Sequence, residues 1–594
     1  MLIQPVDRKE FVERVFPHRY DVMVYTEDNH YYARDSRGNL ICADSPTACL
    51  QESINYIINK QTRGMVFIRS GVYTISAETL INDSGSPRSY SIAIIGEYGA
   101  TIQTTIPTIT PGYNSGIIHF YSQGGTKEIN IEGLNLSLED SSKSFSNVIS
   151  IELDGNATAP QTWRIRIRNN KITSSYQINS SNNYIHGILI HSRVVGSGYS
   201  PVPVDFDVVI EDNKVVGTAN GITVANYGIQ GPASGRVIIR NNFVDTKWNM
   251  FTPTSGIHVF ANSQDPQYFI PTVIIEGNVS LNPGDTAIEL SNAINAIIKG
   301  NTSNGTIIIS YNWINGIVEG NTIYGRPGFI TGLGAYASGQ NIKLIRSTLI
   351  RGNSVYNSTI SAYLDLSQLT SPIDMGPISI LNNNIVFENT TLSQYLHIIK
   401  IQSSNWSNYP PILIMGNNVR VNNVDASGKS ITGIVYAAPR ARVVVANNNL
   451  NFTNVLNASK ILGIDVNNGY PGFIYGNTVV GSSVWLKSYY WGPVYVYDNY
   501  TDNTNIDVDP GIKIIFKRND TYRTENSGTI TIPTNSTSVT VRHGLVCTPK
   551  KVLITPLEQP SGSIWVSNIT STSFDINVST APTTDLPVAW YAEC

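Results

Sequence analysis

Charge is scarce in this sequence. Only 14% of its residues are Asp, Glu, Lys or Arg, whereas about 25% is usual for a globular protein. The 40 basic and 43 acidic residues give a net charge of −3. No basic run occurs, so the electrostatic footprint of nucleic-acid binding is missing. No apolar stretch approaches the about 18 residues that cross a bilayer. These absences argue against nucleic-acid binding and membrane insertion.

Cysteine is also scarce. The four cysteines form two sequence-local pairs, Cys42 with Cys49 and Cys547 with Cys594, which suit either two disulfides or four free thiols. The start, "MLIQPVDRKEFVERVF", has acidic residues where an export signal would have its apolar core. Seventeen Asn-x-Ser/Thr sequons nevertheless suggest an extracellular glycoprotein. A virion protein, assembled inside a cell and exposed outside it, would reconcile these features.

Internal repetition is the strongest positive signal. A six-residue motif recurs at a spacing of roughly 20 to 43 residues. Its first and last positions are apolar, its third is Gly, Asn or Asp, its fourth is Asn, and its second and fifth accept any residue. The repeats begin at Ile167, Ile210, Ile239, Ile298, Val318, Ile350, Ile414, Val445, Ile474 and Val496, with a copy one residue out of step at Leu381. A variable spacing of this kind is typical of stacked coils whose loops differ in length.

The composition of one repeat explains why the coils must stack. Alternation in "WRIRIR" (163–168) sends Trp163, Ile165 and Ile167 to one face of a half-buried strand. The Gly-Asn or Asn-Asn that follows then turns the chain, and the apolar face is buried only by neighbouring coils. We predict that the recurring asparagines are structural and share amide hydrogen bonds from coil to coil. They include Asn170, Asn242, Asn321, Asn417 and Asn477.

A helix precedes the first coil. In "DSPTACLQESINYIIN", Ser45 is the predicted N-cap and Pro46 the first helical residue. One helical face is apolar: Leu50, Ile54, Ile57 and Ile58. This face would cover the open end of the stack. "RGMVFIRSGVYTI" (63–75) would form the first coil and "SIAIIGEYGATI" (91–102) part of the next.

These elements resemble the right-handed parallel β-helix proteins of the pectin-lyase-like superfamily. The resemblance rests on Leu50-Gln51 and Ile54 in the helix, on Val66, Ile68, Gly71 and Tyr73 in the first coil, and on Gly96 and Gly99 in the second. It implies an all-β fold, a right-handed parallel β-helix with an N-terminal capping helix over residues 44–500. This fold supports lyases, hydrolases, viral tailspikes and adhesins alike.

Three further segments complete the predicted organisation. Residues 1–43, with a short helix from about Asp7 to Val15 and a hairpin, would form an attachment region, and residues 501–526 a linker. Residues 527–594 alternate apolar and polar residues in short strands, which predicts a small β-sandwich. This sandwich resembles the receptor-binding modules of viral tail fibres and lectin-like sandwiches. That resemblance rests on "GSIWVSNITSTSFDINVS" and on His543, Gly544, Leu545 and Pro549.

Paired carboxylates are the feature that glycoside hydrolysis requires. The acidic pairs that could lie close together are Asp205 with Asp207 and Asp285 with Glu289, although isolated acids on strands are more often solvated charges. The motifs of the polygalacturonase family are absent. We predict no cofactor and no metal. His186 and His191 have an odd separation, which sends them to opposite faces of an extended strand.

Aromatic residues near turns offer a different functional signal. Large rings can act as flat platforms for recognition. The candidates are Trp406, Tyr409, Trp485, Tyr489, Tyr490, Trp491 and Trp565. The alternative is packing in the core or between subunits, in particular for residues 494–500.

The sequence as a whole predicts a viral tailspike or tail-fibre adhesin that binds host cell-surface glycans or glycoproteins. Its N-terminal region would join virion tail or capsid proteins, and the resemblance to viral β-helix fibres implies a homotrimer. Low charge and abundant sequons look most like proteins of archaeal viruses, such as spindle-shaped viruses. Two alternatives remain open: a polysaccharide depolymerase, either a lyase or a glycoside hydrolase, and a cellular surface adhesin or S-layer-associated protein.

Overall fold

The computed structural model describes most of the chain in two compact units, Met1–Thr348 and Leu349–Cys594. The described residues are 20–82, 87–104, 116–139, 147–153, 159–175, 185–192, 203–226, 233–246, 254–261, 266–325, 332–338, 345–365, 375–404, 411–437, 442–467, 472–489, 493–503, 505–508, 514–519 and 523–594. The short helix predicted between Asp7 and Val15 lies outside them. Within these ranges no helix is long and apolar enough to cross a membrane.

The first unit begins with the predicted hairpin. Strands β1 (Val22–Glu27) and β2 (His30–Asp35) pair antiparallel, and β3 (Leu40–Ala43) joins β2. The hairpin turn has positive φ at Asp28 and Asn29, 51° and 65°, which these two residue types adopt at low cost. Strand β1 also pairs in parallel with β4 (Arg63–Ile68), so the hairpin is built directly onto the first coil.

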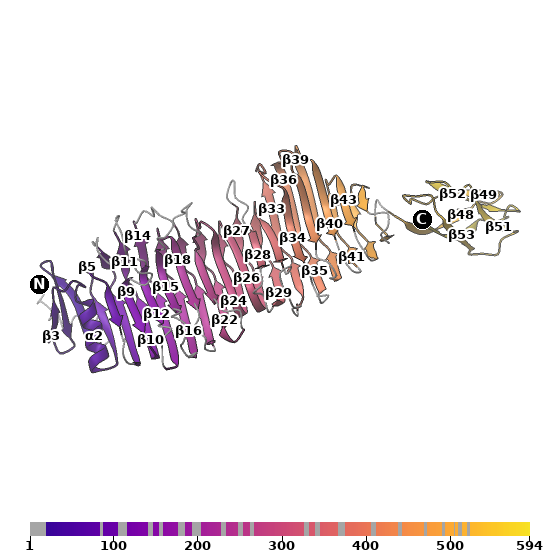
Figure 1. Cartoon of the computed structure of the whole chain (residues 1–594). Coiled ribbons are helices and arrows are strands. Elements are labelled where there is room, and N and C mark those ends of the chain that lie inside the picture. Colours follow the sequence, from indigo (N-terminus) through magenta and orange to yellow (C-terminus); the bar gives the residue numbers. More distant parts are fainter. Residues whose placement is uncertain are drawn as a thin grey trace, which may run out of the picture. The chain divides into compact units, whose positions relative to one another are not determined.

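Helix α2 (Leu50–Lys60) follows and contacts β3, β4 and β6 (Thr79–Asn82) (Figure 1). The predicted apolar face, Leu50, Ile54, Ile57 and Ile58, is buried as expected.

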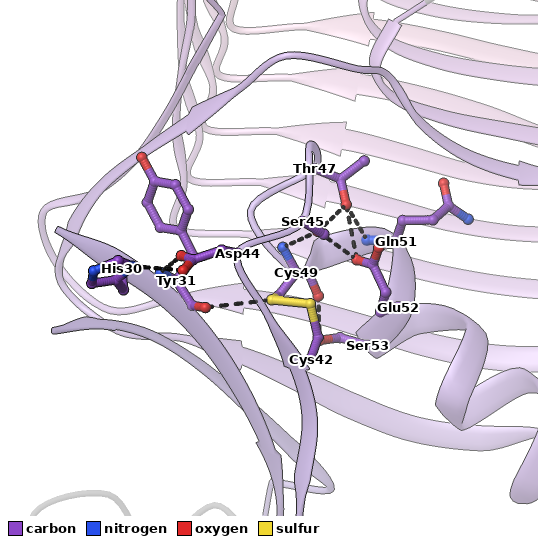
Figure 2. The surroundings of a disulfide bond; sticks show 10 residues. All are labelled: His30, Tyr31, Cys42, Asp44, Ser45, Thr47, Cys49, Gln51, Glu52 and Ser53. Atoms are coloured by element: carbon purple, nitrogen blue, oxygen red, sulfur yellow. Dashed lines mark hydrogen bonds and ion pairs between the residues drawn. A yellow bond between two sulfur atoms is a disulfide. The ribbon is translucent and has the colours of Figure 1, made fainter.

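The predicted N-cap is wrong. The helix begins four residues later than Pro46, behind Cys49, which has a φ of 67°. A hydrogen-bonded turn precedes it, in which the hydroxyls of Ser45 and Thr47 both donate to Glu52, at 2.9 Å each (Figure 2). A disulfide joins Cys42 to Cys49 beside this turn, and these contacts displace the start of the helix.

Each coil of the first unit contributes a strand to each of three parallel sheets (Figure 1). The first sheet contains β4, β7 (Tyr90–Gly96), β10 (Gly125–Glu132), β13 (Gln161–Arg168), β16 (Val204–Glu211), β19 (Ala233–Arg240) and β22 (Ile270–Glu276). The second contains β5 (Gly71–Ile75), β8 (Ala100–Thr104), β11 (Asn135–Leu138), β14 (Lys171–Ser174), β17 (Lys214–Val216), β20 (Phe243–Asp245), β23 (Val279–Leu281), β25 (Thr302–Ser303) and β27 (Thr322–Tyr324). The third contains β6, β9 (Gly116–Ser122), β12 (Asn147–Leu153), β15 (His186–Ser192), β18 (Asn220–Asn226), β21 (Ile257–Ala261) and β28 (Gly332–Ser338).

Two long strands run from the third sheet into the first. These are β24 (Thr286–Lys299) and β26 (Thr306–Glu319), and a single-turn 3₁₀ helix, η1 (Pro266–Tyr268), precedes β22. The described strands of neighbouring coils in the first unit pair in parallel, for example Ile129 with Ile165 and Ile165 with Val208. The register between β24 and β26 shifts at two places. The fold predicted from the sequence, an all-β parallel β-helix with one α-helix among the described residues, is confirmed.

The predicted asparagine ladder is present at the corner between the first and second sheets. Each ladder asparagine donates its backbone and side-chain amides to the side-chain oxygen of the next, as Asn170 does to Asn213, at 3.0 Å each. In the first unit the ladder comprises Asn170, Asn213, Asn242, Asn278, Asn301 and Asn321. The ladder satisfies backbone groups that the corner would otherwise bury without partners.

The outer face of the first sheet carries a column of alternating charges, one residue per coil. The column contains Glu132, Arg168, Glu211, Arg240, Glu276, Lys299 and Glu319. Ion pairs of 2.6–2.8 Å join Arg168 to Glu132, Arg240 to Glu211 and Lys299 to Glu276. A row of aliphatic side chains lies beside it on the same face: Val209, Ile238, Ile274, Ile297 and Ile317. We call this row the aliphatic stripe.

The second unit repeats the three-sheet coil, and β29 (Ile345–Arg351) spans the boundary between the units. Its first sheet contains β32 (Ile378–Leu381), β35 (Pro411–Met415), β38 (Arg442–Ala446), β41 (Gly472–Tyr475), β44 (Val494–Tyr497) and β47 (Ile514–Lys517). The second contains β30 (Ser354–Tyr356), β33 (Asn384–Glu388), β36 (Asn418–Asp425), β39 (Asn449–Leu456), β42 (Thr478–Val480) and β45 (Tyr500–Thr501). The third contains β31 (Thr359–Asp365), β34 (Leu396–Ser404), β37 (Ser430–Ala437), β40 (Lys460–Asn467), β43 (Val484–Tyr489) and β46 (Ile506–Val508).

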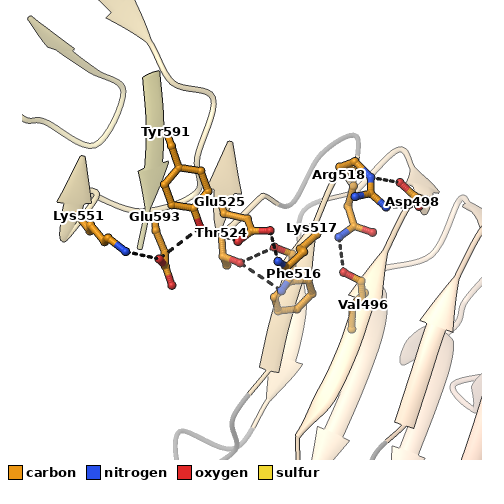
Figure 3. Close-up of polar contacts among 11 residues, drawn as sticks. Val496, Asp498, Phe516, Lys517, Arg518, Thr524, Glu525, Lys551, Tyr591 and Glu593 are labelled. Carbon is orange, nitrogen blue, oxygen red and sulfur yellow. Dashed lines mark hydrogen bonds and ion pairs between the residues drawn. The ribbon is translucent and has the colours of Figure 1, made fainter. Parts of the chain in front are cut away.

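Within the segment predicted as a linker, residues 501–526, the structure describes two strands that extend this stack. Strands β46 and β47 pair in parallel with β43 and β44. Close contacts then lead into the C-terminal module (Figure 3). Thr524 Oγ1 donates to the carbonyl oxygen of Phe516 at 2.8 Å, and Lys517 forms an ion pair with Glu525 at 2.8 Å.

The C-terminal module consists of two three-stranded antiparallel sheets around one apolar core. One sheet has the order β48 (Glu525–Ile532), β53 (Leu586–Glu593), β50 (Lys551–Pro556), and the other β49 (Ser538–Arg542), β52 (Ser573–Val578), β51 (Ile564–Ser567). The core contains Ile532, Val541, Leu545, Phe574, Ile576, Val578, Leu586, Val588, Trp590 and Ala592. A disulfide joins Cys547 to Cys594.

Candidate functional site

Trp565 is the one predicted aromatic candidate that the structure describes as exposed, with 47% of its surface accessible. It lies on β51 and faces away from the module core, because Phe574, Ile576 and Val578 on β52 take the inward positions. Asn577 is its cross-strand neighbour. Asp575, on the same outer face, is the next residue along β52 that points outward.

Hydrogen bonds fix the polar groups around this ring. Asp575 accepts from Thr540 Oγ1 at 2.6 Å and from Asn568 Nδ2 at 2.8 Å, and these bonds lower the pKa of the Asp575 carboxyl. Asn577 Nδ2 donates to Ser567 Oγ at 2.8 Å. An exposed indole beside immobilised carboxylate, amide and hydroxyl groups is suited to a sugar, which has both apolar C–H faces and hydroxyls. We call this surface the Trp565 face.

The second candidate site lies on the outer face of the third sheet in the first unit. Glu289 projects outward between the core residues Ile288 and Leu290. Its carboxylate accepts from Ser310 Oγ at 2.8 Å and from Ser291 Oγ at 3.2 Å. Strands β24 and β26 therefore contribute to this site, and the neighbouring strand β21 places His258 opposite Glu289. We call this site the Glu289 cluster.

Two titratable groups flank Glu289. Burial and the charge of Glu289 together raise the pKa of Asp285, so this carboxyl retains a proton to higher pH than an ordinary aspartate does. His258 Nε2 lies 3.8 Å from Glu289 Oε2. Burial lowers the pKa of His258 overall, although Glu289 opposes this effect. The cluster thus combines Asp285, whose carboxyl has a raised pKa, with the hydrogen-bonded Glu289 and with His258, whose imidazole has a lowered pKa. Carboxyl and imidazole groups of this kind are used in general acid–base catalysis.

Tyr311 adds backbone strain to the Glu289 cluster. Its φ is 65°, which is rare for a bulky aromatic residue. Tyr311 is 41% exposed, and burial and Glu289 raise the pKa of its hydroxyl. Strain of this kind concentrates at functional sites.

The other acidic pair, Asp205 and Asp207, lies on the outer face of the first sheet. Asp207 forms ion pairs with Arg166 at 2.6 Å and with Arg236 at 3.1 Å, and despite partial burial these arginines lower its pKa. Asp205 accepts from Ser234 Oγ at 2.7 Å. Both carboxylates are held in local pairs, and Asp207 is an ordinary ionised partner of two arginines.

The remaining aromatic candidates have three different outcomes. Trp485 is fully buried and its ring packs edge-on against Phe516 at 6.3 Å, so its prediction as a binding platform is wrong and it belongs to the core. Tyr489 ends β43, and its side chain is not described. Trp406, Tyr409, Tyr490 and Trp491 lie outside the described residues.

No group of three or more His, Cys, Asp or Glu side chains in the part of the chain that the structure describes could hold a metal ion. His186 Nδ1 lies 3.0 Å from Thr223 Oγ1. Burial and then the nearby His191 lower the pKa of His186 to about 3.

Two features were not predicted from the sequence. On the first sheet of the second unit, Phe473 stacks on Tyr495 at 5.2 Å and Tyr475 stacks on Tyr497 at 5.0 Å. The alternation of rings with aliphatic residues in "GFIYGN" and "VYVYDN" could have revealed these pairs.

The second unpredicted feature is His119, which lies on the third sheet of the first unit. Its Nδ1 is 3.7 Å from Glu78 and its Nε2 is 3.5 Å from Glu152. These three residues come from separate coils, so no local pattern predicts their contact.

Comparison with known proteins gives structural similarity alone. No protein-family model matches the sequence, and no curated protein matches it. The solved structures similar to this chain include the Gp54 tailspike of Acinetobacter baumannii bacteriophage AP22, at 8% identity and a TM-score of 0.36, covering 91% of this chain and 93% of that one. They also include a tailspike protein mutant of E. coli bacteriophage HK620, at 11% identity and a TM-score of 0.38, covering 94% and 92%. Similarity at this level concerns the general architecture and assigns no function.

Proposed function

We propose that this protein is a virion-borne attachment protein of the tailspike kind that binds host-surface glycans through the Trp565 face. The observation that carries this proposal is the exposed indole of Trp565, held on a rigid strand beside the hydrogen-bonded Asp575 and Asn577. The indole would stack on a sugar ring, and the fixed polar groups would bind its hydroxyls. Repeated weak contacts on many copies would give lasting attachment.

Binding of the full chain to an immobilised glycan array and to host-envelope material tests this proposal. Trp565→Ala should reduce binding at least about tenfold, which corresponds to about 1.4 kcal/mol, while Trp565→Phe should retain most of it. Leu553→Ala is the matched control, because Leu553 is 51% exposed on the other sheet of the same module. Equal binding by the native protein and Trp565→Ala would contradict the proposal.

Residues 1–43 are proposed to attach the protein to the virion, and a homotrimer is proposed as its assembly. The aliphatic stripe supports self-association, because Ile238, Ile274, Ile297 and Ile317 face outward and are only half-buried, so association would remove their remaining accessible surface from water. Ile274→Asp places a charge at the centre of the stripe and should dissociate the oligomer in sedimentation experiments. A native protein that sediments as a monomer would contradict the trimer.

A second function, cleavage of a host polysaccharide, is favoured by the raised pKa of Asp285 beside Glu289. Asp285 would act as the general acid and Glu289 as the nucleophile or base, as glycoside hydrolysis requires. Glu289→Gln should reduce the release of reducing sugars from host-envelope material at least about a hundredfold, whereas Asp207→Asn should leave it unchanged. Absence of release by the native protein would rule out this activity and leave the attachment function untouched.

A further inference from the structure

A lysine and an aspartate face each other on neighbouring coils of the second unit. Asp465 on β40 and Lys487 on β43 are partners in the parallel register between these strands (Figure 1). Both side chains project from the outer face of the third sheet, because the preceding residues, Ile464 and Leu486, are buried in the core. Lys487 Nζ lies 3.4 Å from Asp465 Oδ2. The fold thus holds an amino group next to a carboxyl group that belongs to a different coil.

The carboxyl group of Asp465 is buried although it points away from the core. Its neighbour on β37, Val435, is also buried, so one flank of the carboxyl is apolar. Asp465 Oδ1 has no hydrogen-bond partner among the residues that the structure describes. Burial raises the pKa of Asp465, although Lys487 opposes this effect. The ion pair between the two side chains therefore carries a desolvation cost that their attraction offsets only in part.

A second pair of the same chemistry lies beside the first one. Lys460 Nζ lies 2.7 Å from Asp507 Oδ2, and Asp507 on β46 is the register neighbour of Lys487. The two pairs differ in their access to water, since 33% of the Asp507 side chain is accessible, against 8% of the Asp465 side chain. Water stabilises the charges of the Lys460 pair, so only the Asp465 pair has a strong reason to become neutral.

We propose that Lys487 and Asp465 condense to an amide bond that ties β43 to β40. The ammonium group first passes one proton to the carboxylate, which gives an amine and a carboxylic acid. Nζ then forms a bond to Cγ, and the bond between Cγ and one carboxyl oxygen breaks. That oxygen leaves as water, with one proton from the nitrogen, so the reaction requires no oxidant, reductant or further reactant. The inference stands without the Trp565 face and the Glu289 cluster.

Two features of the fold favour this condensation. The parallel register keeps the amine beside the carboxyl group, and well-oriented intramolecular reactants behave as if at concentrations of about 10⁵–10⁸ M. The product also replaces two poorly solvated charges by one neutral amide, which removes their desolvation cost. The bond would lie near the end of the stack, because β46 is the last described strand of the third sheet. Chain ends open most readily, so a covalent tie is most useful there.

Intact mass spectrometry of the full-length protein, after reduction of both disulfides, tests this inference. The native protein should be lighter than its sequence mass by one molecule of water. Proteolytic digestion should then yield a branched peptide, in which the segment that contains Lys487 is joined to the segment that contains Asp465. Lys487→Arg keeps the positive charge, but its guanidinium stays protonated and cannot form the amide, so this variant should have its full sequence mass. Asp465→Ala should have its full sequence mass as well.

Lys460→Arg is the matched control, because Lys460 belongs to the more exposed pair of the same face. It should lose one water as the native protein does. Circular dichroism of each variant, expected to match that of the native protein, separates loss of the bond from loss of fold. A native protein of full sequence mass, or a loss of water that persists in Lys487→Arg, would overturn the inference. A linear peptide that carries the loss, as cyclisation of an aspartate onto its own backbone would give, would overturn it too.

Discussion

The side-chain oxygen of Asn242 accepts two hydrogen bonds from Asn213, one from its backbone amide and one from its side-chain amide, both at 3.0 Å. Asn242 in turn donates to the carbonyl oxygen of Ile210 at 2.9 Å. Both asparagines are buried, so replacing either one leaves several polar groups without partners. We therefore predict that Asn242→Ala lowers the free energy of unfolding by about 3 kcal/mol, measured by denaturant titration.

The neighbouring residue Asn241 provides the control for this prediction. Asn241 is exposed and has a φ of 55°, a conformation that glycine adopts without penalty. Asn241→Gly should change the free energy of unfolding by less than about 1 kcal/mol. Equal effects at positions 241 and 242 would refute a specific role for the ladder.

The backbone strain at Tyr311 should lower the stability of the folded protein. Asn292, on the preceding long strand, also has positive φ, 55°, and asparagine adopts this conformation more readily than tyrosine. Tyr311→Asn should therefore raise the free energy of unfolding by about 1 kcal/mol. If the Glu289 cluster cleaves polysaccharide, the same substitution should slow the release of reducing sugars. A destabilised Tyr311→Asn variant would show that packing of the ring outweighs the strain.

His119 should make stability depend on pH on the neutral and alkaline side. Burial alone would lower its pKa, but Glu152 and Glu78 raise it overall above the ordinary value. A raised folded-state pKa stabilises the protein below the unfolded-state value of about 6.5 and loses this contribution as pH rises through the folded-state value. Urea unfolding at pH 5.5 and pH 8.5 should show this loss, of about 1 kcal/mol.

His119→Gln removes the titrating group and retains a polar side chain of similar length. It should lack the part of the pH dependence between pH 5.5 and pH 8.5 that His119 contributes. His258 serves as the comparison, because burial lowers its pKa and its contribution to stability has the opposite sign. If His119→Gln kept the full pH dependence of the native protein, the assignment to His119 would fail.

The Cys547–Cys594 disulfide should matter most for the C-terminal module. It closes a loop with a sequence separation of 47 residues, for which chain entropy gives a stabilisation of about 4 kcal/mol. Modules of this size have a small core. The double variant Cys547→Ala with Cys594→Ala should therefore unfold in this module at lower temperature and lose glycan binding there, while calorimetry should show the β-helix transition unchanged.

The repeated parts of this molecule were predictable from the sequence, and the assembled sites were not. The strand "WRIRIR" and the asparagines follow local rules of alternation and turn formation, so their burial and hydrogen bonds could be predicted. The predicted start of the helix was wrong because Ser45 and Thr47 donate hydrogen bonds to Glu52 in a turn that replaces the predicted N-cap. The prediction for Trp485 was wrong because the exposure of its ring depends on packing against Phe516, which comes from a later coil. The grouping of Glu289 with His258 likewise requires the parallel register between coils.

The alternating column of charges also has a consequence for the order in which coils add to the stack. Arg168 and Arg240 each pair with the glutamate that precedes them, and Glu211 separates the two arginines. If the coil of β16 were left out during folding, Arg168 would meet Arg240 directly, and like charges on adjacent strands repel. The column therefore destabilises any folding intermediate in which a single coil has been skipped, because such an intermediate would place like charges on adjacent strands.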